Sequence, residues 1–119
     1  MKTIDLPLDE KSIIDLRAGD WVLLNGIIYV ARDSAHKKIV EALAKEEKLP
    51  FELKGATVYY MGPSPTRLNA VIGSAGPTTS GRMDKYAPEL LRRGLKGMIG
   101  KGFRSTEVKK AIIEYRAVY

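Results

Sequence analysis

The chain has 119 residues, of which 45% are hydrophobic and 29% charged, with a formal net charge of +6. This composition is typical of one globular domain spanning residues 1–119, and no apolar run is long enough to cross a bilayer. The chain has no cysteine and one histidine, His36, so it cannot build a thiolate or histidine metal site alone. Its N-terminus is too short and interrupted for a signal peptide, so we expect a cytoplasmic protein.

The positive charge makes nucleic acid or an anionic small molecule the partner to consider. The 20 basic residues are spread along the chain, without a long basic run or an RNA-binding pattern of interleaved aromatic residues. Most should therefore lie on solvated faces, and we expect neither nucleic acid nor a membrane as partner. The exceptions are cations beside glycines or ahead of a helix, namely Arg32, Arg82 and Lys101.

The first half of the chain predicts strands followed by a helix. The strands are expected at 2–8, 21–24 and 27–31. Asn25-Gly26 lies between two apolar runs and predicts a hairpin, because both residues tolerate positive φ. Asp33 or Ser34 is expected to cap a helix that runs to about Lys48.

The second half alternates strands and helices, which predicts a compact α/β domain. Strands are expected at 56–61 and 96–99, a further strand begins at 117–119, and helices are expected at 83–93 and from 105 onward. Segment 62–65 is a rigid connector, and an apolar run at 68–72 leads into a glycine-rich loop. Pro88 must lie near the start of its helix, and Gly94 should end it.

The glycine-rich loop, Gly73–Asp84, combines a pliable backbone with reactive side chains. Its glycines allow unusual backbone angles, and Pro77 stiffens the approach to Thr78 and Thr79. Ser80 or Thr79 can cap a helix whose first turn holds Arg82, so that backbone N–H groups and a guanidinium face one small volume. A carboxylate would suit this volume. Alternatively, the hydroxyls simply satisfy the loop backbone.

Other candidate residues also have a plain structural reading. Arg32 stands at a strand-to-helix junction, where an arginine often forms a surface ion pair. His36 lies one turn into a helix, where histidines are often packed or solvent-facing. Gly100-Lys101-Gly102 is not a nucleotide P-loop, because the required residues before and after it are absent.

Three motifs follow one another along the chain. They are RDSAHK at 32–37, GPTTSGRMD at 76–84 and MIGKG at 98–102. Their order resembles the β subunit of class I fumarate hydratases and L(+)-tartrate dehydratases, which corresponds to the C-terminal domain of single-chain members. The resemblance implies a β/β/α swivelling-type domain. Domains of this family continue past the position that matches Tyr119, so this chain is expected to be truncated at its C-terminus.

The resemblance implies a hydro-lyase that interconverts fumarate and (S)-malate. In this family a four-iron four-sulfur cluster, held by three cysteines of an α subunit, leaves one iron open to the substrate. This chain would then act only with a cysteine-containing α subunit, in an αβ assembly that dimerises further. Tartrate dehydratase, which converts tartrate to oxaloacetate, and a non-catalytic basic binding module are the alternatives.

The resemblance also implies a role for each site residue. Arg32 and Arg82 match arginines that hold substrate carboxylates, and Lys101 matches a lysine that contacts the same dianion. Thr78 matches the threonine proposed to exchange the C3 proton. A threonine hydroxyl is a poor base in water, so cationic neighbours would be needed to stabilise its alkoxide. His36 is expected to line or support the pocket.

Overall fold

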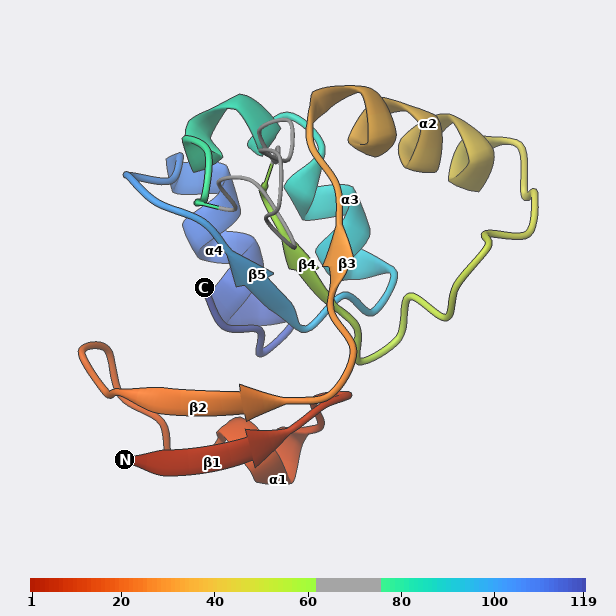
Figure 1. Cartoon of the computed structure of the whole chain (residues 1–119). Helices are drawn as coiled ribbons and strands as arrows, with labels where there is room; N and C mark the ends of the chain where they lie inside the picture. Colours follow the sequence, from red (N-terminus) through yellow and green to blue (C-terminus); the bar gives the residue numbers. More distant parts are fainter. Residues whose placement is uncertain (62–75) are drawn as a thin grey trace, which may run out of the picture.

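The computed structural model describes residues 1–61 and 76–119 (Figure 1). In chain order the elements are β1 (Lys2–Asp5), α1 (Glu10–Ile13), β2 (Val22–Asn25), β3 (Tyr29–Val30), α2 (Asp33–Ala44), β4 (Thr57–Tyr59), the 3₁₀ helix η1 (Ser80–Met83), α3 (Ala87–Arg92), β5 (Gly97–Ile99) and α4 (Thr106–Glu114). The α/β class is confirmed. The predicted connector at 62–65, the apolar run at 68–72 and the first part of the glycine-rich loop lie outside the described residues.

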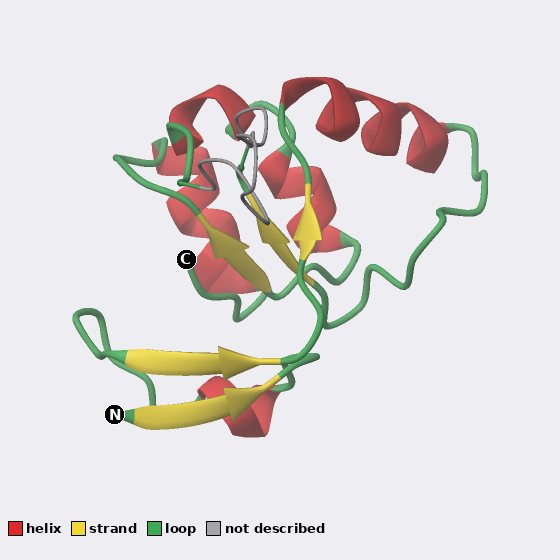
Figure 2. Cartoon of the chain, viewed as in Figure 1, coloured by secondary structure: helices red, strands yellow, loops and turns green. Residues whose placement is uncertain are grey.

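The strands form two parallel sheets, which Figure 2 shows as separate layers. The first sheet pairs β1 with β2 and carries α1. The second has the order β3-β4-β5, so β4 is its central strand. The carboxyl ends of β3, β4 and β5 therefore meet at one edge of the second sheet.

The hairpin prediction at Asn25-Gly26 is wrong. β2 pairs in parallel with β1, and Asn25 stands opposite Asp5, while β3 pairs with β4 in the other sheet. Gly26 has φ 135° and passes so close to Leu6 that an added Cβ would lie 2.9 Å from the Leu6 Cβ. The dipeptide thus carries the chain from one sheet to the next, because parallel pairing of both strands outweighs a local turn preference.

Helix α2 begins where it was predicted but is shorter and lacks the predicted caps. It ends at Ala44, and Glu46 follows with φ 56°, instead of the helix reaching about Lys48. Arg32 is the N-cap residue and makes no side-chain capping bond, so the prediction that Asp33 or Ser34 caps the helix is wrong. Asp33 is instead the first helical residue, where a carboxylate interacts favourably with the helix dipole.

The predicted helix 83–93 is shorter than expected: Met83 ends η1, and α3 spans only Ala87–Arg92. Pro88 lies in the first turn of α3, and Gly94 follows its end with φ 112°, as predicted. Thr79 precedes η1 without a side-chain capping bond, and Ser80 is already inside η1, so the predicted hydroxyl cap is wrong. Val118 forms an isolated parallel bridge with Gly97 near the C-terminus, where the sequence predicts that a strand begins.

The main core lies under the three-stranded sheet, where α3 and α4 pack against each other (Figure 1). Its fully buried apolar side chains include Val58, Tyr60, Met83, Leu90, Leu91, Leu95 and Val108. A second, smaller cluster of Ile4, Leu8 and Ile13 joins β1 to α1. Within 1–61 and 76–119, no helix has the length and apolar character required to cross a membrane.

Candidate functional site

The candidate site lies at the carboxyl edge of the three-stranded sheet. β3 leads into Arg32 and the N-terminus of α2, β4 leads into Tyr60, and β5 leads into Lys101. In parallel α/β sheets this edge is where ligands usually bind, since loops and helix N-termini converge there. The topology therefore brings the 32–37 and 98–102 motifs to one end of the sheet, although they lie more than 60 residues apart.

The described part of the glycine-rich loop runs between the ends of β4 and β5. Thr78 donates its backbone N–H to the Tyr60 carbonyl at 2.7 Å, and its side chain is half-buried. Thr79 forms a parallel bridge with Lys101, and the Ser80 N–H donates to the Lys101 carbonyl at 2.9 Å. These bonds place Thr78 and the exposed Lys101 on neighbouring segments.

A glycine is required where β5 leaves the sheet. A Cβ added at Gly100 would lie 2.1 Å from the Ser80 Oγ and 2.7 Å from the Tyr60 ring. Only a residue without a side chain lets the glycine-rich loop approach β5 this closely. Gly100 thus sets the separation between the Thr78 and Lys101 segments.

Arg82 joins η1 to the start of α2. Its Nη2 forms an ion pair with Asp33, whose neighbour Arg32 is exposed. Figure 1 shows η1 and the N-terminus of α2 at the same end of the three-stranded sheet. The structure thus brings Arg82 close to the Arg32 segment. The Arg82 side chain is 60% exposed and keeps further N–H donors for a ligand.

His36 lies in the first turn of α2, and its side chain is fully buried. Its Nδ1 lies 2.9 Å from the Arg32 carbonyl, so this nitrogen carries the proton in the neutral ring. The ring packs edge-on against Tyr60 at 5.3 Å and near Tyr86 at 6.0 Å. Its Nε2 has no hydrogen-bond partner within the described part of the chain. In this position His36 supports the Arg32 segment from below.

The buried histidine predicts that stability depends on pH. Burial lowers the pKa of His36 below its usual 6.5, although the Arg32 carbonyl and Asp33 oppose this shift. The unfolded chain therefore binds more protons below pH 6.5, and the free energy of unfolding should fall there by at most about 1.4 kcal/mol per pH unit. Urea unfolding between pH 5 and 7.5 measures this slope. His36→Asn should lack this contribution, and an identical pH slope in the variant would contradict the prediction.

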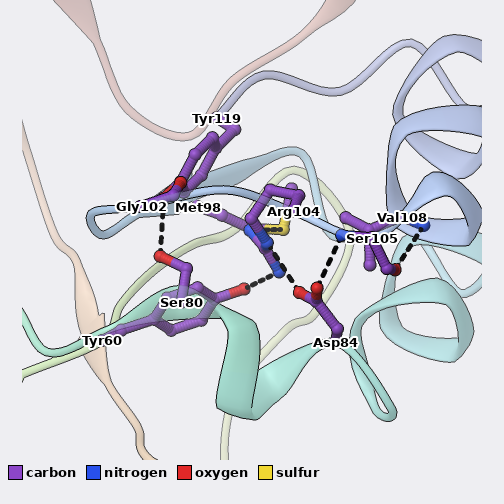
Figure 3. Close-up of polar contacts among 9 residues, drawn as sticks. All are labelled: Tyr60, Ser80, Asp84, Met98, Gly102, Arg104, Ser105, Val108 and Tyr119. Carbon is purple, nitrogen blue, oxygen red and sulfur yellow. Dashed lines mark hydrogen bonds and ion pairs between the residues drawn. The ribbon is translucent and has the colours of Figure 1, made fainter.

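A buried polar cluster that sequence reasoning missed lies beneath the site (Figure 3). The Arg104 side chain is only 2% exposed, and its Nε donates to Asp84 Oδ1 at 2.8 Å. Its Nη2 donates to the Tyr60 hydroxyl at 3.1 Å. The second Asp84 oxygen accepts the Ser105 N–H at 2.7 Å. Arginine is rarely buried without a partner, but no local sequence pattern around Arg104 predicts that it is buried.

Two further hydroxyls connect this cluster to the glycine-rich loop. The Ser80 Oγ lies 2.7 Å from the Tyr119 hydroxyl, which donates to the Gly102 carbonyl at 2.9 Å. Burial raises the pKa of Tyr60, although Arg104 opposes the shift, so its hydroxyl is neutral at physiological pH. Neutral hydroxyls and the Arg104–Asp84 ion pair thus connect the glycine-rich loop to the end of β5.

This chain supplies no thiolate ligand for an iron–sulfur site. The sequence contains no cysteine to supply thiolate ligands. Across the part of the chain that the structure describes, no group of three histidine, aspartate or glutamate side chains is arranged to hold a metal ion. The residues gathered at the site offer cations and hydroxyls, which bind anions.

Comparison with known proteins identifies the family of this chain. Residues 1–119 match the family model described as fumarase C-terminus. The chain is 42% identical over 115 residues to a putative L(+)-tartrate dehydratase subunit beta of Methanocaldococcus jannaschii, which covers 94% of this chain and 59% of that protein. It is 34% identical over 121 residues to a putative fumarate hydratase class I of Geobacillus stearothermophilus, covering 98% of this chain. It is 42% identical over 97 residues to the aerobic fumarate hydratase class I of Escherichia coli, covering 81% of this chain.

The chain spans only part of each relative. It covers 59% of the M. jannaschii protein, 23% of the G. stearothermophilus protein and 18% of the E. coli protein. The match nevertheless includes nearly all of this chain and all three motifs. The chain therefore belongs to the fumarase C-terminus family, together with the β subunit of tartrate dehydratase and the corresponding region of class I fumarate hydratases.

Proposed function

We propose that this chain is the β subunit of a hydro-lyase that interconverts fumarate and (S)-malate. The observation that supports this is the meeting of the 76–84 and 98–102 motifs at the carboxyl edge of one sheet, through the bonds of Thr78 and Ser80. The finer fold assignment, a β/β/α swivelling-type domain, belongs to the same proposal.

The cations would bind the two substrate carboxylates. Arg32, Arg82 and Lys101 are exposed. A guanidinium binds a carboxylate through two parallel N–H bonds, which fixes the orientation of the dianion. Thr78 would then exchange the proton at the C3 carbon, with the neighbouring cations favouring its alkoxide form. His36 would act from beneath, by supporting the segment that carries Arg32.

The remaining parts of the enzyme are assigned to a partner. We propose that a cysteine-containing α subunit holds a four-iron four-sulfur cluster, because this chain has no cysteine. The name of the M. jannaschii relative, subunit beta, supports a separate partner chain. The proposed assembly is an αβ unit that dimerises further in the cytoplasm.

Tartrate dehydratase is the second candidate function. The M. jannaschii relative, which aligns with 94% of this chain, is a putative L(+)-tartrate dehydratase subunit beta. Tartrate and malate are both dicarboxylates with an α-hydroxyl group, so the same three cations suit either substrate. The reaction would then convert tartrate to oxaloacetate.

Coexpression with a cysteine-containing α subunit tests the proposed function. The complex should be purified anaerobically and assayed with fumarate, malate and tartrate. We expect turnover of a dicarboxylate by the complex, with no turnover and no iron–sulfur absorbance for this chain alone. Turnover by the chain alone would sink the two-subunit proposal. A cluster-loaded complex that acts on none of the three substrates would refute the hydro-lyase proposal.

Arg82→Lys should weaken dicarboxylate binding. A lysine ammonium cannot make the bidentate contact while it also faces Asp33, so the expected loss is about 1–3 kcal/mol. Steady-state kinetics of the complex should show this as a higher KM. The matched control is Arg93→Lys at the C-cap of α3, whose exposed side chain pairs with Glu89. Unchanged KM and kcat in the Arg82 variant would place Arg82 outside the site.

A further inference from the structure

We propose that Arg104 is a positioning residue for this site: its buried guanidinium holds together the segments that carry Thr78, Arg82 and Lys101. The inference rests on the proposed function for the meaning of the site, but the contacts themselves are those of the folded chain. They are drawn in Figure 3.

Arg104 binds three different segments at once. Its Nε donates to Asp84, which follows η1, and its Nη2 donates to Tyr60, which follows β4. Its Nη1 faces the Met98 sulfur of β5 at 3.6 Å. The guanidinium also lies over the Tyr119 ring, at 4.7 Å from its centroid. A planar fork of N–H donors can reach several acceptors in fixed directions, which an ammonium group cannot do.

Each of these segments leads directly to a candidate site residue. Asp84 is two residues beyond Arg82, and Arg104 itself is three residues beyond Lys101. The carbonyl of Tyr60 accepts the Thr78 N–H at 2.7 Å, while the hydroxyl of the same tyrosine accepts from Arg104. One side chain therefore fixes the three segments relative to one another.

Burial separates this role from substrate contact. The Arg104 side chain is 2% exposed, so it does not face a ligand at the exposed cations. A buried ion pair is also a poor way to gain stability alone, because apolar residues of similar volume often stabilise a core as well or better. Its position beneath the segments that carry Thr78, Arg82 and Lys101 indicates that it is needed to fix their relative positions.

The test measures loop order and catalysis separately. In Arg104→Lys, backbone hydrogen exchange measured by NMR should be about tenfold faster at the Thr78 and Ser80 N–H groups. The His36 N–H, which bonds within α2, should exchange at the wild-type rate. In the αβ complex, kcat should fall by about a hundredfold, since small misplacement of reacting groups is costly, with a smaller change in KM. Arg93→Lys at the C-cap of α3 is the matched control.

Tyr60→Phe is the milder variant, and it tests the positioning role of Arg104 if Arg104→Lys does not fold. It removes only the hydroxyl that accepts from Arg104 and keeps the carbonyl that binds Thr78. Relative to wild type, we expect hydrogen exchange to accelerate more at the Thr78 N–H than at the His36 N–H. Unchanged exchange at Thr78, or equal acceleration at Thr78 and His36, would overturn the proposal. Selective acceleration in a chain whose wild-type complex acts on no dicarboxylate would support the positioning role and refute the proposed function instead.

Discussion

Replacing Thr78 by alanine in the αβ complex is expected to lower kcat by about 10²–10⁴-fold while KM changes little. The proposed proton exchange at C3 is made in the transition state, so its loss should slow the reaction without weakening substrate binding. The backbone bond from the Thr78 N–H to the Tyr60 carbonyl does not need the side chain and should remain. Initial-rate kinetics with fumarate and malate measure kcat and KM separately.

Thr79→Ala is the matched control for Thr78→Ala. Thr79 has the same side chain one position further along, is exposed, and faces Lys101 through a backbone bridge. Its replacement should leave kcat within about threefold of wild type, as for a surface substitution. A near-normal kcat in Thr78→Ala would remove Thr78 as the proton carrier. Equal losses in both variants would indicate a general disturbance of the loop.

Replacing Arg104 by methionine is expected to destabilise the isolated chain by about 3–5 kcal/mol, because it leaves the Asp84 carboxylate largely buried without its partner. The same substitution at Arg93, the exposed C-cap residue of α3, should have little effect. Urea unfolding at pH 7 measures both. A loss below about 1 kcal/mol for Arg104→Met would show that the pair behaves like a surface ion pair.

A second substitution shows whether the loss comes from the unpaired carboxylate. Asp84→Asn removes that charge and keeps the shape of the side chain. Combined with Arg104→Met, it should destabilise the chain by less than the sum of the two single changes, since the residues are in direct contact. Additive losses would mean that the two side chains act independently.

Local patterns predicted most of the elements correctly. The first turn of α3 contains Pro88 and its end is marked by Gly94, both as expected from the backbone properties of these residues. Prediction failed where a distant partner outweighed a local preference. Asn25-Gly26 does not form a hairpin turn, because β2 pairs with β1 in one sheet and β3 pairs with β4 in the other.

The candidate site was likewise predictable only in part from the sequence. Thr78, Arg82 and Lys101 were selectable from their residue types and motifs, and the structure places Thr78 and Lys101 on bridged segments. The partners of the site residues were not predictable. Arg82 pairs with a residue 49 positions away, and no helical or strand periodicity relates two such positions.

The amino-acid sequence was sufficient to establish the α/β class, the absence of cysteine ligands and the presence of cations beside glycine-rich segments. These properties follow from composition and from interactions between near neighbours. Tertiary packing decided that His36 is buried under Arg32 and that Arg104 joins Asp84 to Tyr60. Those outcomes depend on which distant surfaces exclude water from each other, and the cost of burying an unpaired polar group then selects the contacts.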